Sequence, residues 1–166
     1  MDKVKQIYIG HNSLITSLGN KIQTFAALEE KKCGLAYNEE YKMIVGSINK
    51  NLPLASSQEG CTFFESLVIN NISAVISDSQ LETKASNLLV ILSTTKGNIG
   101  KLEESVEPIP HDAFLGTTAL KIQKYIGLAN LPLVISNACI SGVSALIIAR
   151  ELILQGAYDH VIVVGC

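Results

Sequence analysis

One cysteine stands where nucleophilic chemistry is favoured. Cys139 lies between an apolar stretch of strand length, residues 133–136, and an apolar stretch of helical length, residues 140–155. A thiol at the first turn of a helix lies in the positive end of the helix dipole, beside unpaired backbone N–H groups. This position favours the nucleophilic thiolate, and the N–H groups can stabilise a developing oxyanion. We therefore take Cys139 as the candidate nucleophile.

The other three cysteines are Cys33, Cys61 and Cys166, and we expect them to be structural or incidental. They are widely spaced and form no C-x-x-C pair, so we expect no zinc site and no other metal or cofactor. Residues 1–5 lack the apolar core of a secretion signal, which predicts a cytoplasmic, reduced location.

Two other chemistries fit the sequence poorly. An α/β-hydrolase turn requires glycine two residues before and two residues after its nucleophile. Asn137 and Ser141 occupy those places around Cys139. Residues 94–100 read Thr-Thr-Lys-Gly-Asn-Ile-Gly, which lacks the G-x-x-x-x-G-K-[ST] spacing of a phosphate-binding loop. The sequence therefore favours neither a hydrolase nor a nucleotide site.

The elements that must position Cys139 alternate between strand and helix. Strands are expected at residues 4–9, 43–48, 88–92, 133–136 and 161–164. Helices are expected at residues 21–32, 61–77, 114–126 and 140–155. Asn20 and Gly34 are the expected caps of the first helix. This alternation predicts an α/β fold with a five-stranded, largely parallel sheet.

The stretch after Cys139 is apolar around nearly its whole circumference. Its apolar residues are Ile140, Val143, Ala145, Leu146, Ile147, Ile148 and Ala149. A helix of this kind is buried on all sides, and one sheet covers only one side. Residues 125–149 carry no charge, but Asn130 and Pro132 interrupt them, which favours a buried strand and helix over a membrane span. We expect a further body to cover this helix.

Charge excludes one class of partner and leaves another open. The net charge is −2 and Arg150 is the single arginine, so nucleic acid binding is not expected. Four scattered lysines offer a docking surface for an acidic carrier protein or, as the favoured interpretation, plain solvated surface. They are Lys31, Lys32, Lys121 and Lys124.

The residues around Cys139 resemble the nucleophile turn of the β-ketoacyl synthases, condensing enzymes of the thiolase fold. Residues 136–142, Ser-Asn-Ala-Cys-Ile-Ser-Gly, are similar to the family's small residue, Ala-Cys and further small residues. Residues 115–128, from Leu-Gly-Thr-Thr-Ala to Gly-Leu, are similar to the helix that leads into the cysteine strand. The segments 14–34 and 155–165 also resemble the family, although His11 and Ser13 replace two usual glycines.

The resemblance implies a fold of two similar units, of which this chain is the first. The family's fold repeats a layered unit twice, and the chain resembles only the first copy, a βαβαβαβ unit with a five-stranded mixed sheet. Residues 1–166 are therefore expected to form the N-terminal half of a β-ketoacyl synthase, a single thiolase-like unit without its C-terminal half. The expected partner is a complementing C-terminal half or a second copy in a homodimer.

The resemblance also implies the reaction of a 3-oxoacyl-[acyl-carrier-protein] synthase, in fatty-acid or polyketide synthesis. Cys139 would hold the acyl group as a thioester, with its backbone N–H forming half of the oxyanion hole. A malonyl thioester on acyl carrier protein would decarboxylate and attack that thioester. The family's two catalytic histidines lie in His-Gly-Thr and Gly-His contexts, which His11, His111 and His160 do not match. The chain alone is therefore expected to be inactive in condensation.

The alternative is a non-catalytic partner subunit that shapes chain length in such a synthase. That type of subunit typically replaces the nucleophile, so the presence of Cys139 argues against it.

Overall fold

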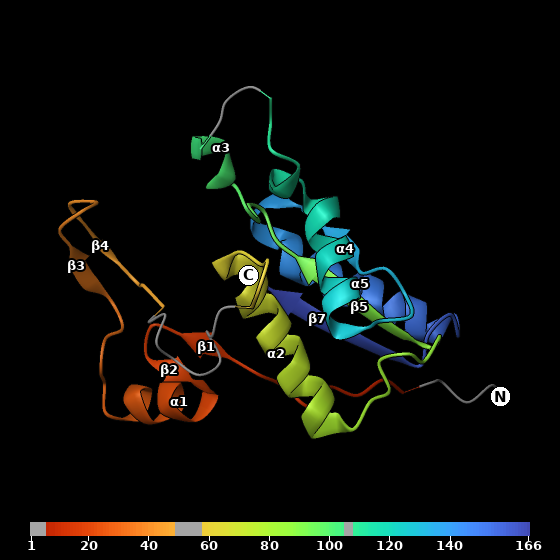
Figure 1. The fold of residues 1–166 in the computed structure, drawn as a ribbon. Coiled ribbons are helices and arrows are strands. Elements are labelled where there is room, and N and C mark those ends of the chain that lie inside the picture. The colour runs from red at the N-terminus through yellow and green to blue at the C-terminus, as the bar shows by residue number, and fades with distance from the viewer. Residues whose placement is uncertain (1–5, 49–57, 105–107) are drawn as a thin grey trace.

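The structure is a computed structural model that describes residues 6–48, 58–104 and 108–166. Its centre is a three-stranded parallel sheet in the order β6 (Leu133–Ile135), β5 (Leu88–Ser93) and β7 (His160–Gly165). Helices α2 (Phe63–Ser79) and α4 (Leu115–Ile126) lie on one side of this sheet, and α5 (Ser141–Leu154) lies on the other (Figure 1). The α/β class expected from the sequence is confirmed.

The central strand β5 is buried along its whole length, as its continuous apolar run predicts. Side chains of a strand alternate between the two faces of the sheet. Leu88, Val90 and Leu92 therefore pack with α2 and α4, whereas Leu89 and Ile91 pack against α5. The core thus consists of two apolar layers, one on each face of the sheet.

The strand order explains why α4 and α5 lie on opposite faces. From β5 the chain crosses through α4 to β6, and from β6 it crosses back through α5 to β7, beyond β5. The two crossovers run in opposite directions across the sheet. Crossovers of the same hand therefore place their helices on opposite faces.

Both helices that precede the sheet begin with a capping box. Asn20 caps α1 (Lys21–Glu29) by accepting a hydrogen bond from the Gln23 N–H, as its sequence position predicts. Thr62 caps α2 in the same way through Glu65. The expected C-cap at Gly34 is wrong, because α1 ends at Glu29 and Lys31 adopts the left-handed conformation there.

The expected five-stranded sheet is not what the described residues form. The predicted strand at 43–48 is β4 (Met43–Val45), and it pairs antiparallel with β3 (Ala36–Asn38) in a separate hairpin. A short turn brings these two strands together locally, which requires no long-range pairing. Residues 6–9 of the first predicted strand have no regular structure, and its residues 4–5 lie outside the described ranges.

The remaining N-terminal elements form a small unit of their own. Strands β1 (Ile15–Thr16) and β2 (Gly19–Asn20) pair in a short hairpin that leads directly into α1. Figure 1 shows the β3–β4 hairpin standing away from the parallel sheet. Later in the sequence, α3 (Lys101–Glu104) forms a single turn in the connection between β5 and α4. None of these elements joins the three-stranded sheet.

Among the described residues, only one side of helix α5 is covered. Ala145 and Ala149 are buried against β5, and their small side chains let the helix lie close to the sheet. Its outer face carries four large apolar side chains that are each more than half exposed: Ile140 in the preceding turn, then Val143, Leu146 and Ile147. This arrangement agrees with the expectation that α5 needs a second cover.

Candidate functional site

The carboxyl ends of the three parallel strands meet at one edge of the sheet. In the observed register Ser93 lies opposite both Ile135 and Gly165, so all three strands end side by side. In open α/β sheets ligands bind outside this edge. The segment with Cys139 follows β6 at this edge, which makes the edge the place to look for chemistry.

Cys139 is exposed and lies in a 3₁₀ turn, Ala138–Ile140, between β6 and α5. The sequence placed it in the first turn of the α-helix, but α5 begins two residues later, at Ser141. A single 3₁₀ turn is a common way to start a helix, and the period of an apolar run does not reveal it. The thiol is therefore presented just ahead of the helix that follows.

Ser141 fixes the shape of the turn. Its Oγ donates to the carbonyl oxygen of Ala138 at 2.7 Å and accepts a hydrogen bond from the N–H of Asn137 at 2.8 Å. The N–H groups of Ile140 and Ser141 close the turn by donating to backbone carbonyls, and that of Cys139 takes no part in closing it. The oxyanion role expected for this N–H is therefore compatible with the local bonding.

The residue before Cys139 has an unusual backbone. Ala138 has φ +45°, in the left-handed region that residues other than glycine, asparagine and aspartate rarely adopt. Such conformations cost about 1–3 kcal/mol and cluster at functional sites. The outlier next to the thiol is an observation that the sequence pattern did not predict, because alanine carries no signal for it.

The loop after β5 borders the same edge. The N–H of Thr94 donates to the carbonyl oxygen of Ile135, four residues before Cys139. On the other flank, a methyl group built on Gly142 would lie 3.9 Å from the Ser93 Oγ, so the Ser93 side chain faces the first turn of α5. Ser93 and Thr94 therefore lie between the two segments that flank Cys139.

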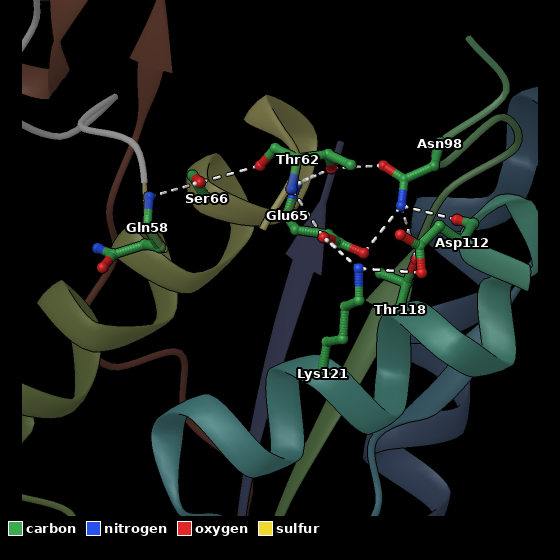
Figure 2. A network of polar contacts seen from close by, with 8 residues as sticks. All are labelled: Gln58, Thr62, Glu65, Ser66, Asn98, Asp112, Thr118 and Lys121. Atoms are coloured by element: carbon green, nitrogen blue, oxygen red, sulfur yellow. Dashed lines mark hydrogen bonds and ion pairs between the residues drawn. The ribbon is translucent and has the colours of Figure 1, made fainter. Parts of the chain in front are cut away.

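A buried polar network anchors the far end of this loop (Figure 2). Asn98 donates from Nδ2 to Glu65 Oε1 at 2.8 Å, to the Asp112 carbonyl oxygen at 3.0 Å and to Thr118 Oγ1 at 3.3 Å. Its Oδ1 accepts from the Thr62 hydroxyl at 2.6 Å. Glu65 and Thr118 have no exposed surface. One side chain thus joins the loop to α2, to the turn at His111–Ala113 and to α4.

Lys121 neutralises the buried carboxylate. Its Nζ lies 3.3 Å from Glu65 Oε2 and 3.1 Å from Asp112 Oδ1. Burial alone would lower the pKa of Lys121, but its hydrogen bond to Asp112 and the charge of Glu65 raise that pKa above its usual value. Lys121 is therefore committed to an internal ion pair. Its proposed place on a carrier-docking surface is not supported, because three quarters of its side chain is covered.

The other cysteines differ from Cys139 in their surroundings. Burial and the neighbouring charge of Glu65 raise the pKa of the Cys61 thiol. Desolvation raises the pKa of the Cys166 thiol, and the backbone N–H of Cys166 donates to the Ser93 carbonyl oxygen. Cys33 is exposed near the end of α1, away from the sheet edge. That these three cysteines are structural or incidental stays a prediction.

The three histidines are dispersed. His11 lines a groove of about 750 Å³ that runs along β7 between α2 and α5. His111 packs edge-on against Phe114, with ring centroids 6.0 Å apart. His160 begins β7, at the opposite edge of the sheet from Cys139. The fold does not bring these side chains together into one site.

Glu65 and Asn98 are the residues that sequence reasoning missed. The pattern Thr62-x-x-Glu65 is a capping-box signature, so the role of Glu65 at the start of α2 was readable. Its partner Asn98 lies 33 residues further along the chain, in a loop with no pattern that points back to α2.

No family model matches the chain, and no curated protein matches it. Among the helices of the described residues, none combines the length and hydropathy needed to cross a membrane. Within the same residues, no group of three His, Cys, Asp or Glu side chains gathers as a metal site would require.

Proposed function

We propose that the chain is the N-terminal half of a thiolase-like condensing enzyme of the β-ketoacyl synthase type, with Cys139 as the acyl-accepting nucleophile. The observation that carries the proposal is the place of Cys139. It is an exposed thiol at the carboxyl edge of a parallel sheet, in a turn that follows a left-handed Ala138 and is fixed by Ser141. The resemblance of residues 136–142 to the family's nucleophile turn points to the same chemistry.

The proposed first step is acyl transfer to the thiol. The Cys139 thiolate attacks the carbonyl carbon of an acyl thioester, a new S–C bond forms, and the bond to the carrier sulfur breaks. The carrier leaves as a thiolate, which takes up a proton. The backbone N–H of Cys139 would stabilise the oxyanion of the tetrahedral intermediate.

The proposed second step forms the carbon–carbon bond. A malonyl thioester on acyl carrier protein loses carbon dioxide, and the electron pair of the broken bond becomes a carbanion. This carbanion attacks the acyl carbonyl carbon on Cys139, and the cysteine leaves as a thiolate. Residues that assist the decarboxylation would come from the complementing half, since the three histidines of this chain lie apart.

The outer face of α5 supports the proposal of an incomplete unit. Four large apolar side chains are exposed there, within one face of a helix whose opposite face packs on the sheet. Contiguous apolar surface of this kind marks an interaction site in a folded protein. We assign it to the complementing half of the enzyme or to a second copy, in a cytoplasmic setting.

Thiol labelling tests the nucleophile. The purified chain is treated with a limiting amount of a neutral alkylating reagent, and the modified peptides are quantified by mass spectrometry. Cys139 is expected to react faster than Cys33, which is also exposed and serves as the internal control. Equal rates at the two thiols would contradict the proposal.

Substrate turnover tests the half-enzyme. The chain alone is expected to acylate slowly from an acyl thioester and to make no condensation product with a malonyl thioester. Condensation by the purified chain without a partner would show that the chain is catalytically complete. Loss of acylation in Cys139→Ser, with acylation retained in Cys33→Ser, would identify the loaded residue.

A further inference from the structure

The peptide group between Ala138 and Cys139 is held by one residue. Its carbonyl oxygen accepts two hydrogen bonds, one from the backbone N–H of Ser141 and one from the Ser141 hydroxyl at 2.7 Å. The same hydroxyl accepts a hydrogen bond from the N–H of Asn137 at 2.8 Å. A carbonyl only accepts and an N–H only donates, so the partners of the hydroxyl settle the direction of both bonds.

The direction of this carbonyl fixes the direction of the Cys139 N–H. A peptide group is planar and almost always trans, so its C=O and its N–H point in opposite directions. Ser141 is only 5% exposed, whereas residues 136–140 are all exposed. The Ala138 carbonyl thus points inward to Ser141. The Cys139 N–H, on the other side of the same peptide, points outward to the surface on which the thiol is exposed.

The two hydrogen bonds to the carbonyl also make this N–H a stronger donor. Hydrogen bonds that share a peptide group polarise one another, so each bond that the C=O accepts strengthens the N–H of the same peptide as a donor. The Cys139 N–H itself forms no hydrogen bond with the described residues. Within the described part of the chain it is therefore a polarised donor that is free to bind a ligand.

The backbone of Ala138 requires the support that Ser141 supplies. Its φ of +45° is disfavoured for alanine and persists only where the surrounding bonds hold it. The Ser141 hydroxyl bonds to the N–H of Asn137 on one side of Ala138 and to the Ala138 carbonyl on the other. Without the hydroxyl, the backbone at Ala138 is free to relax and to turn the Cys139 N–H away from its present direction.

We propose that Ser141 is a positioning residue of the Cys139 site: through the Ala138 carbonyl it orients and polarises the Cys139 N–H, which then stabilises the oxyanion formed when the thiolate attacks a carbonyl group. The inference rests on the proposed function, because an oriented N–H serves catalysis only if Cys139 takes up acyl groups. Its geometric basis, a carbonyl that accepts two hydrogen bonds from Ser141, does not depend on which acyl compound reacts.

The test compares two reactions of the same thiol. With para-nitrophenyl acetate, the Cys139 sulfur forms a bond to the acetyl carbon, negative charge develops on the carbonyl oxygen, and para-nitrophenolate leaves. Alkylation by iodoacetamide displaces iodide from a saturated carbon and forms no oxyanion. Both products are quantified by mass spectrometry of the peptide that contains Cys139.

Ser141→Ala is expected to slow acylation selectively. The acylation rate should fall by about tenfold, less than the roughly hundred- to thousandfold cost of removing an oxyanion donor, because the N–H remains and only its support is lost. The alkylation rate should stay within about twofold, since that reaction uses no oxyanion donor. The acylation-to-alkylation ratio at Cys33, which lies away from this turn, should not change.

A merely structural role predicts a different result. If losing the hydroxyl only distorts the turn or hides the thiol, the acylation and alkylation rates of Cys139 fall together and their ratio stays constant. Equal changes in the two rates therefore overturn the positioning role.

The matched control is Ser144→Ala, one helical turn beyond Ser141. The Ser144 hydroxyl accepts a hydrogen bond from Asn137 Nδ2 at 3.2 Å, and none of the described hydrogen bonds joins this hydroxyl to the Ala138 carbonyl. Its removal is expected to leave the acylation-to-alkylation ratio at Cys139 unchanged. A fall equal to that in Ser141→Ala overturns the proposal.

A pair of substitutions of equal size applies if Ser141→Ala does not fold. Ser141→Thr retains the hydroxyl and Ser141→Val removes it, and both place the same bulk at this buried position. The acylation-to-alkylation ratio is expected to keep its original value in the threonine variant and to fall by about tenfold in the valine variant. The same ratio in both variants overturns the proposal.

Loading from an acyl thioester separates this inference from the proposed function. If the unaltered chain takes up no acyl group from a thioester while Ser141→Ala still lowers the ratio measured with para-nitrophenyl acetate, the proposed function fails and the role of Ser141 stands. If thioester loading proceeds and the ratio is the same in the unaltered chain and in Ser141→Ala, the role of Ser141 fails and the proposed function stands.

Discussion

The two faces of the parallel sheet are covered in different ways. On the side of α2 and α4, apolar side chains pack against β5 and a buried polar network closes the gap between the helices. On the side of α5, the layer next to the sheet is packed, but the next surface outward is apolar and exposed. In the described residues one face of the sheet is therefore fully covered, whereas the helix on the other face has an exposed apolar outer surface.

Polar residues also have different roles around Glu65 and near Cys139. Around Glu65 every buried polar side-chain atom of the described residues has a hydrogen-bond partner, so the network is self-contained. Near Cys139 the polar groups of Asn137 and Ser141 shape a turn and leave the thiol exposed. The first arrangement favours a rigid support, and the second presents a reactive group at the edge of that support.

The largest loss of stability is expected from a substitution in the buried polar network on the α2 and α4 side of the sheet. Glu65→Ala removes a buried carboxylate that accepts hydrogen bonds from the Thr62 N–H, the Asn98 amide and Lys121. The free energy of unfolding is expected to fall by about 3 kcal/mol, because these three donors each lose an acceptor inside the protein. Urea unfolding followed by circular dichroism measures it.

An exposed ion pair provides the control for Glu65. Glu151 pairs with Arg150 on the surface of α5, and both side chains are about half exposed or more. Glu151→Ala is expected to change the free energy of unfolding by less than about 0.5 kcal/mol. Comparable losses in the two variants would mean that the buried network is no more important than the surface pair.

A smaller loss of stability is expected from substitutions in α5, and only on the side that faces the sheet. Ala145 is fully buried against the sheet, so Ala145→Leu is expected to cost about 1–3 kcal/mol through overpacking. Ile147→Lys, on the outer side, is expected to leave the unfolding free energy within about 0.5 kcal/mol of its original value. It is also expected to reduce self-association, measured by analytical ultracentrifugation.

Two results would contradict this difference between the two sides of α5. If Ile147→Lys destabilises the fold as much as Ala145→Leu, the outer face is buried by something within this chain. If the unaltered chain is already a monodisperse monomer that binds no apolar dye, the face has no tendency to recruit a partner.

The smallest effect is expected at alkaline pH. The pKa of Lys121 is raised in the folded state, so the folded chain holds this proton more tightly than the unfolded chain. The resulting stability is fully present below the ordinary lysine value of 10.5 and is lost as the pH rises above it. Lys121→Met is expected to flatten this alkaline loss, measured as the urea midpoint from pH 8 upward in steps. An identical alkaline slope in both proteins would assign the loss to other groups.

Much of the sheet could be predicted because its signals are local. The five-residue apolar run at the start of β5 indicates burial on both faces, and Gly127 ends α4 in the left-handed conformation that glycine favours. The apolar circumference of α5 likewise indicated a helix that its own sheet cannot cover. These features depend on residues within one element.

The parts that could not be predicted depend on contacts between distant residues. Met43–Val45 has strand character, but nothing in those residues says whether β4 joins the main sheet or a local hairpin. Lys121 looks like any surface lysine until Glu65 and Asp112 are placed beside it. Cys139 was found from its neighbours in sequence, whereas the role of Asn98 in the loop after β5 was not, because Asn98 bonds to residues on other elements.

The order of the three strands has a consequence for how the chain is made. The central strand β5 is synthesised first, and its neighbour on one edge, β7, comes last. At about 5–20 residues per second, the ribosome needs on the order of ten seconds between Ser93 and His160. During that interval one hydrogen-bonding edge of a largely apolar strand has no native neighbour to pair with. The nascent chain is therefore most prone to aggregation just before β7 emerges, and a chaperone that binds extended apolar segments would act on β5 in that window.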